Sequence, residues 1–200
     1  MNYRSTRSAD VKYTSAQILK QGLAADGGLF VPTSLPTLDE TAVAALSKMN
    51  YAGRAAYVLG LFLTDYSEDE LSEMAKKAYS RRNFGCNPAP LSRLENDYVL
   101  ELWHGPTSAF KDMALQIMPM LLSKSLEKTG EKRDALILVA TSGDTGKAAL
   151  EGYKNVPRVS IQVFYPESGV SNIQKRQMQT QEGGNVGVCA IRGNFDDAQS

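Results

Sequence analysis

Residues 135–154 read ALILVATSGDTGKAALEGYK and predict a strand, a tight loop and a helix in direct succession. The run ALILVAT (135–141) is apolar without interruption, which is typical of a strand buried in a parallel sheet. Small residues follow, and KAALEGYK (147–154) then predicts a helix. A strand, a short connection and a helix in this order form the building block of an open α/β sheet.

The same alternation continues on both sides of this unit. The expected elements are a strand at 98–103, one long helix at 109–128 with a kink at Pro119, a strand at 160–166, a helix at 172–181, a strand at 186–192 and the opening turn of a helix at 194–200. This order predicts an α/β fold with an open, mostly parallel sheet, right-handed crossovers and flanking helices. Because the last helix has no visible end, we expect the chain to be truncated within its fold.

The first 96 residues predict a largely helical region with short strands. DGGLFVP (26–32) predicts a turn that enters a strand, with Gly27 and Gly28 free to adopt positive φ. Helices are expected at 38–49, at 55–63 and at 67–82, the second of them buried, and a loop is expected at 84–94. Ser67 is the expected N-cap of the third helix, which would end in the basic pair Arg81–Arg82. The resulting division is this N-terminal region at 1–96, a strand and helix at 97–128, and an α/β small domain, incomplete at its C-terminal end, at 129–200.

Composition and charge exclude several classes of protein. Twenty-two basic residues balance twenty-two acidic ones, which argues against a nucleic-acid partner held by phosphate contacts. The longest apolar stretch (55–63) is far shorter than the ~20 residues that span a bilayer, and no secretory signal is visible, so we expect no membrane partner. The two cysteines, Cys86 and Cys189, form no C-x-x-C pair, which favours a cytoplasmic setting without a metal site. Nothing in the sequence indicates an oligomeric state.

The segment HGPTSAFKD (104–112) places a lysine where a strand gives way to a helix. Lys111 is expected in the first turn of that helix, with Thr107 or Ser108 as its N-cap. The positive end of a helix disfavours an ammonium ion, and a free amine is what a Schiff base with an aldehyde needs. An ordinary surface lysine remains the alternative, because lone lysines at helix starts are common.

The segment TSGDTGKAA (141–149) follows the apolar strand and opens the next helix. Its small residues let the backbone approach a ligand, and the N–H groups at a helix start suit an anion. A Walker A loop is excluded, since Thr141 stands where that pattern needs glycine. A tight turn capped by Ser142 or Asp144 explains the same residues, so both interpretations stay open.

Other residues carry weaker signals. His104 is the only histidine, and it suits a hydrogen-bonded structural role as well as a chemical one. Lys175 and Arg176 could hold a phosphate, but a solvated helix face explains them better. Trp103 is expected in the core.

HGPTSAFKD and SGDTG, in this order and about thirty residues apart, resemble segments of the threonine synthase family. STRS, DGGLFVP and PESGVSNIQKRQM are similar to further segments of that family, so the resemblance covers the whole chain. It implies a fold-type II enzyme that depends on pyridoxal 5'-phosphate (PLP) and holds it as a Schiff base on Lys111.

The resemblance also implies a reaction and a set of contacts. O-phospho-L-homoserine and water would become L-threonine and phosphate, with Lys111 as the catalytic residue. PLP would contact Lys111, Phe110 and Asp144, and the substrate would contact Ser142, Gly143, Thr145, Gly146, Thr107 and Ser108. Because the Asp144 carboxylate would repel the substrate carboxylate, backbone N–H groups, Ser142 and Thr145 are the expected partners of the latter. The glycine-rich loop for the PLP phosphate would lie beyond residue 200, which predicts an inactive chain if these residues stand alone.

Two other functions stay open. One is another fold-type II enzyme, such as a threonine dehydratase or cysteine synthase, against which HGPT and DGGLFVP argue by resemblance. The other is a threonine-synthase-like protein that binds PLP or a phosphorylated metabolite without turnover, against which the intact Lys111 argues.

Overall fold

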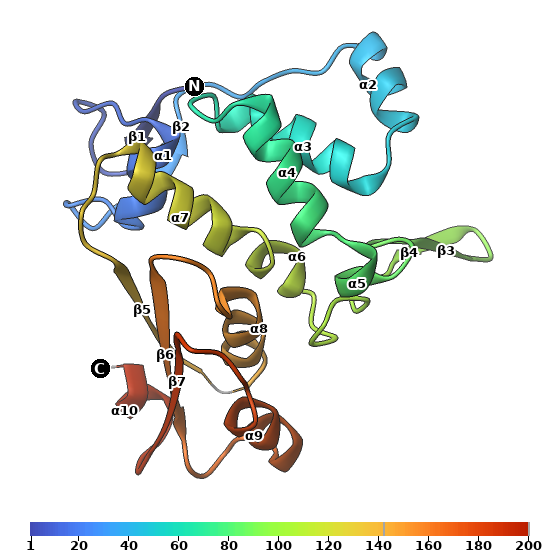
Figure 1. Ribbon diagram of the computed structural model, residues 1–200. Helices are drawn as coiled ribbons and strands as arrows, with labels where there is room; N and C mark the ends of the chain where they lie inside the picture. The colour runs from blue at the N-terminus through green and yellow to red at the C-terminus, as the bar shows by residue number, and fades with distance from the viewer. Residues whose placement is uncertain (142, 200) are drawn as a thin grey trace. The chain divides into compact units, whose positions relative to one another are not determined.

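The computed structural model describes residues 1–141 and 143–199 (Figure 1). The chain divides into two compact units. Unit 1 comprises Met1–Ser80 and Lys124–Lys132, and unit 2 comprises Arg81–Ser123 and the chain from Arg133 onward. Among the described residues, no helix combines the length and the apolar character that crossing a bilayer requires.

Unit 1 is largely helical. Its elements are β1 (Tyr3–Ser5), α1 (Ser15–Gln21), β2 (Phe30–Pro32), α2 (Glu40–Ser47), α3 (Tyr51–Phe62), α4 (Glu68–Ala78) and the end of α7 (Met118–Lys128). The predicted turn before β2 is confirmed, with Gly27 at a φ of 74°. Gly28 does not use this freedom; glycine is needed there because a Cβ would lie 2.1 Å from the Ser5 Oγ.

Helix α4 begins as predicted and ends earlier than predicted. Ser67 caps it, and Glu70 completes a capping box by accepting from the Ser67 N–H at 2.9 Å. Tyr79 leaves helical geometry with a ψ of 35°, and its ring packs edge-on against Tyr51 at 4.9 Å between centroids. The basic pair Arg81–Arg82 therefore belongs to a separate short helix, α5 (Arg81–Phe84), in unit 2.

The apolar stretch at 55–63 is helical, but the prediction that it is buried is wrong. No residue of α3 is fully buried, and Tyr57 and Val58 are exposed. A helix that is apolar all round needs neighbours on every side, and α3 packs mainly against α4.

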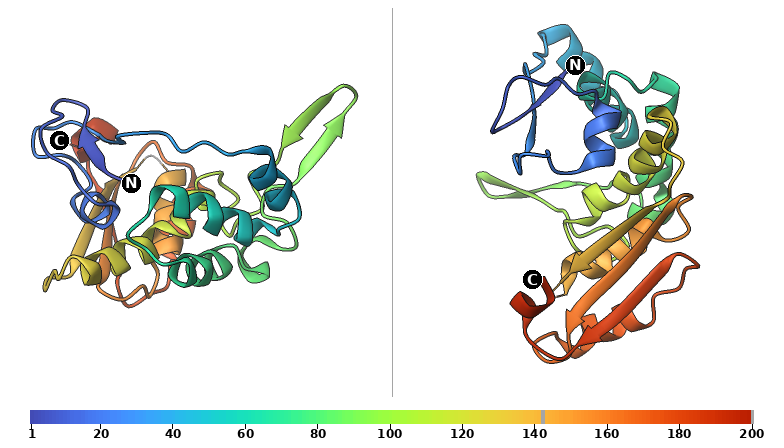
Figure 2. Two further views of the ribbon diagram at one scale, coloured as in Figure 1. Left: turned by 90° about the horizontal axis from the view of Figure 1, so that it is seen from above. Right: turned by 90° about the vertical axis from the view of Figure 1, so that its left-hand side faces the viewer.

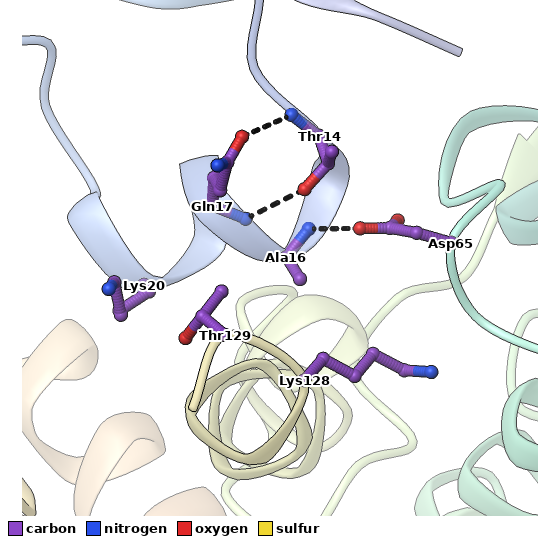
Figure 3. A pocket seen from close by; sticks show the side chains of 7 residues that line it. All are labelled: Thr14, Ala16, Gln17, Lys20, Asp65, Lys128 and Thr129. Carbon is purple, nitrogen blue, oxygen red and sulfur yellow. Dashed lines mark hydrogen bonds between the residues drawn. The ribbon is translucent and has the colours of Figure 1, made fainter. Parts of the chain in front are cut away.

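Helices α1 and α7 of unit 1 are joined by polar contacts. Thr14 and Gln17 form a capping box at the start of α1, and the Ala16 N–H donates to Asp65 Oδ2 at 2.8 Å (Figure 3). The buried Ser125 hydroxyl of α7 donates to the Ala16 carbonyl at 2.7 Å. Figure 3 also shows the pocket that these residues line with Lys20, Lys128 and Thr129. Since several of its polar groups are already paired, we read this pocket as structural.

Unit 2 contains the parallel sheet. Its elements are α5, β3 (Leu91–Leu94), β4 (Asp97–Leu100), α6 (Asp112–Leu115), the start of α7, β5 (Ala135–Ala140), α8 (Asp144–Tyr153), β6 (Val159–Pro166), α9 (Asn172–Gln179), β7 (Val186–Ile191) and α10 (Phe195–Gln199). Strands β5, β6 and β7 pair in parallel in that order (Figure 2). The predicted parallel sheet and its alternation with helices are confirmed.

The core of unit 2 lies on one face of this sheet. Alternate residues of β6 (Val159, Ile161, Val163 and Tyr165) are at most 2% exposed and pack with Leu150 of α8 and Met178 of α9. On the opposite face, Leu136 and Leu138 of β5 are 61% and 66% exposed. The prediction that 135–141 is buried on both faces is therefore wrong, because α8 and α9 cover the face of β6 that carries the core.

The predicted strand at 98–103 exists in a different sheet. It is β4, which pairs antiparallel with β3 to form a hairpin, so part of the loop predicted at 84–94 is also strand. The turn between the strands contains only Glu95 and Asn96, with Glu95 at a φ of 52°, as short hairpin turns require. Every residue of both strands is exposed. The expected core residue Trp103 is 52% exposed, so that prediction is also wrong.

Glu70 predicts an acid-dependent loss of stability in unit 1. Burial would raise the pKa of its carboxyl, but hydrogen bonds from Lys128, the Ser67 N–H and Lys124 outweigh it and lower the pKa to about 2. Because the folded pKa lies below the ordinary glutamate pKa of 4.5, the stabilisation is complete above that pH and is lost as the pH falls towards 2. Glu70→Gln keeps the capping box and loses both ion pairs, so unfolding in urea should show a loss of about 1 kcal/mol at pH 7.

The control is Glu127→Gln, which removes a more exposed partner of Lys124. It should change the free energy of unfolding by less than Glu70→Gln. An equal free energy of unfolding for Glu70→Gln and the parent at pH 7 would contradict this account.

Candidate active site

The segment before α6 is held by a buried carboxylate. Asp112 is 0% exposed, and its two oxygens accept from the Thr107 N–H at 2.8 Å and from the Thr107 hydroxyl at 2.7 Å. Gly105 lies against the same side chain, since a Cβ there would lie 2.5 Å from Asp112 Cβ. The expectation that Thr107 or Ser108 caps the helix is wrong: the capping position is Lys111, and Asp112 reaches back to Thr107 instead.

Lys111 therefore stands at the start of α6 on a turn with a defined shape. Its side chain is half-buried, and its Nζ lies 4.7 Å from the centroid of the exposed Phe110 ring. Ser108, three residues earlier, has a φ of 58°, a backbone state that costs free energy for a residue with a side chain. Among the described residues, no carboxylate pairs with the Lys111 amine, which leaves it available to a ligand.

The single helix predicted at 109–128 is two helices. Pro119 has no N–H to donate to the Leu115 carbonyl, so α6 ends at Leu115 and α7 starts at Met118. The backbone of α8 occupies the space beside that carbonyl: a Cβ on Gly152 would lie 2.0 Å from the Leu115 oxygen. Helix α6, which Lys111 begins, thus packs directly on α8, which the SGDTG loop begins.

The loop at the start of α8 is organised by a residue that the motif analysis did not select. The hydroxyl oxygen of Thr141, which is 2% exposed, accepts from the N–H groups of Gly143 and Gly146 at 3.0 Å each. A Cβ on Gly146 would lie 2.4 Å from Thr141 Cγ2. The signal was available: a threonine at the end of an apolar strand, directly before the glycines.

These contacts limit the groups that could bind a ligand. The N-cap is Gly143, at a φ of 152° and without a side-chain cap, so the expectation of Asp144 as N-cap is wrong, and Ser142 lies outside the described residues. Among the described residues, the N–H groups of Asp144 and Thr145 meet no acceptor, and both residues are exposed. Two such N–H groups at the start of a ten-residue helix are donors of the kind that suits an anion.

His104 has a structural partner. Its Nε2 lies 2.6 Å from Glu101 Oε2, and its ring stacks on Trp103 at 5.6 Å between centroids. Hydrogen bonds from Ser92 and His104 hold the pKa of Glu101 below its usual value. The hydrogen-bonded interpretation of His104 accounts for these contacts.

Comparison with known proteins connects these features. Residues 2–79 match the family model described as Threonine synthase N terminus. Over 201 residues the chain is 41% identical to the threonine synthase of Pseudomonas aeruginosa, covering all of this chain and 42% of that protein. The PLP-bound crystal structure of threonine synthase from Brucella melitensis matches with a TM-score of 0.91 and 37% identity, over 100% of this chain and 43% of that one.

Over its whole length the chain is similar to the N-terminal part of threonine synthases. It spans about two fifths of the length of the curated relatives it matches. A human relative named threonine synthase-like 2 is 38% identical over 200 residues, which cover 98% of this chain and 41% of that protein. The similarity to threonine synthases therefore leaves the activity to be tested.

The contact of α6 with α8 predicts the effect of a small substitution. Gly152→Ala would place a methyl group against the Leu115 carbonyl, and neither backbone can move freely, so the free energy of unfolding should fall by roughly 1–3 kcal/mol. Urea unfolding followed by circular dichroism measures this. The control is Gly60→Ala in α3, where the new Cβ would lie 3.7 Å from Leu71 Cδ1 and should not destabilise. Equal stability of Gly152→Ala and the parent would refute the close approach.

Proposed function

We propose that this chain supplies the lysine-bearing part of a threonine synthase, which converts O-phospho-L-homoserine and water into L-threonine and phosphate. One observation carries the proposal. Lys111, whose amine pairs with no carboxylate among the described residues, begins α6. Helix α6 packs on α8, whose first two N–H groups meet no acceptor in the same described part of the chain. A nucleophilic amine and a helix start that suits a carboxylate, carried by two helices that pack together, suit an amino-acid substrate.

The residues present fit PLP at its aldehyde end. Lys111 is half-buried and free of a carboxylate partner, as covalent attachment of an aldehyde requires, and Phe110 lies beside it. The open N–H groups of Asp144 and Thr145 are assigned to the substrate, so we assign no residue of this chain to the PLP phosphate. When bound, PLP supplies the electron sink that stabilises negative charge on the substrate carbons.

The chain's own residues would act by position and by proton transfer. The N–H groups of Asp144 and Thr145, with the Thr145 hydroxyl, would orient the substrate carboxylate. Gly143 and Gly146 would keep the backbone of this loop in place. The remaining substrate contacts would come from Ser142, Thr107 and Ser108. Lys111 would move the proton at the substrate Cα and at the neighbouring carbon. Orientation of this kind can supply several kcal/mol of barrier lowering. A cytoplasmic location belongs to the same proposal, with both cysteines free.

A second candidate is a protein of the family with another activity or none. It is favoured by the human threonine synthase-like 2, whose 38% identity is close to the 41% of the bacterial synthase. The assay separates the two. The protein expressed from the complete open reading frame is supplied with PLP and O-phospho-L-homoserine. Equal amounts of threonine and phosphate support the synthase, and PLP binding without threonine supports the second candidate.

Lys111→Ala should abolish the link to PLP that borohydride can reduce, and with it the turnover. The measurement is mass spectrometry of the reduced protein from the complete open reading frame. Lys154→Ala is the control, because it removes a lysine of the same unit that pairs with Glu182 on the surface. A cofactor mass retained at wild-type yield in Lys111→Ala would assign the link to another lysine.

Thr145→Ala should weaken substrate binding more than PLP binding. Loss of one hydrogen bond to a charged group corresponds to about 1.5–3 kcal/mol. Separate titrations with substrate and with PLP measure the two affinities. Thr145→Ser keeps the hydroxyl and should retain the affinity for substrate. Equal losses for both ligands would place the loop at the cofactor instead.

A further inference from the structure

The side chain of Gln174 in α9 lies over the start of α8. The Ser171 hydroxyl donates to Gln174 Oε1 at 2.9 Å, and Gln174 Nε2 donates to Asp144 Oδ1 at 2.6 Å. Ser171 is also the N-cap of α9, and its hydroxyl oxygen accepts from the Gln174 N–H at 3.3 Å. The amide of Gln174 is therefore held at both ends, and its orientation follows from those two contacts.

Gly143 lets this amide come close. A Cβ on Gly143 would lie 2.6 Å from the Gln174 amide carbon and 2.7 Å from its nitrogen. The φ of 152° at Gly143 is one that a residue with a side chain rarely adopts. Glycine at 143 thus serves the loop shape and the approach of Gln174 together.

Asp144 needs a partner at this place for an electrostatic reason. A carboxylate on the first residue of a helix is drawn to the positive helix end, where it competes for the same N–H groups as an anionic ligand. It would also repel a substrate carboxylate. Glutamine can hold an aspartate oxygen through a neutral N–H, without placing a cation at the start of α8 that would compete for the substrate carboxylate.

We propose that Gln174 is a positioning residue, which holds the Asp144 carboxylate towards α9 and so leaves the N–H groups of Asp144 and Thr145 to the substrate carboxylate. This inference rests on the proposed function, because it assigns those N–H groups to the substrate. It adds a residue from α9 to a site otherwise built from α6 and α8.

The fold of unit 2 does not depend on this one side chain. The segment directly after α9 is also joined to α8 by Gln181, whose Nε2 donates to Glu151 Oε2 at 2.7 Å and whose Oε1 accepts from Lys147. Met178 of α9 is fully buried in the core. Loss of the Gln174 amide should therefore act on the loop and leave α9 in place.

The direct test follows the backbone N–H signals of Asp144 and Thr145 by NMR during titration with acetate, a probe for the substrate carboxylate. Gln174→Ala should require about tenfold more acetate than the parent. Gln174→Glu fills the same space without a donor and should be at least as weak. Gln179→Ala is the matched control, since this glutamine of α9 bonds Tyr165 and not the loop. It should titrate like the parent.

The role of Asp144 is tested by a double-mutant cycle. If Gln174 acts through the Asp144 carboxylate, then Gln174→Ala should have little effect on acetate binding in an Asp144→Asn background. Equal effects in both backgrounds would overturn the inference, as would unchanged acetate binding in Gln174→Ala alone.

The outcomes separate this inference from the proposed function. Acetate binding that depends on Gln174, in a protein that makes no threonine, sustains the positioning role and overturns the synthase. Threonine synthesis by a protein whose Asp144 and Thr145 signals ignore acetate sustains the synthase and overturns the positioning role. In an active protein, Gln174→Ala should raise KM about tenfold with a smaller change in kcat.

Discussion

The backbone of α8 touches the Leu115 carbonyl at Gly152, and the arrangement of the candidate site follows from that contact. Pro119 leaves this carbonyl without its helical donor, and Gly152 has no Cβ to keep α8 away from it. The two residues together bring the helix that Lys111 begins against the helix that the SGDTG loop begins. Since both partners are backbone, the spacing between the two helices cannot relax by a change of rotamer.

In the loop before α8, some backbone N–H groups are hydrogen-bonded within the loop and others are not. Thr141 takes the N–H groups of Gly143 and Gly146, which fixes the loop, and the first N–H groups of α8 stay open. The negative charge of Asp144 would weaken anion binding at the positive start of α8. The neutral side-chain amide of Gln174 holds the Asp144 carboxylate by a hydrogen bond. A preorganised donor pair of this kind binds an anion without reorganisation at the moment of binding.

Local pattern was sufficient for most elements. The apolar run at 135–141 predicted β5, and the alternation after it predicted the parallel sheet. The cap at Ser67 predicted the start of α4. Hydrophobic period, element length and capping all depend on near neighbours in the chain. Burial was predicted less well. The exposed face of β5 at Leu136 and Leu138, and the exposed hairpin, depend on what packs against them, and a strand's own residues do not specify that.

The sequence by itself determined the reactive residue types and their order. HGPTSAFKD places a lysine at the start of one helix, and SGDTG then places a loop of small residues at the start of the next. Only the tertiary structure decided how they meet. The hydrogen bonds of Asp112 with Thr107, the contact of Gly152 with Leu115 and the hydrogen bond from Gln174 to Asp144 join residues from 5 to 37 positions apart. Contacts at such separations depend on the fold that closes the chain, and no local periodicity encodes them.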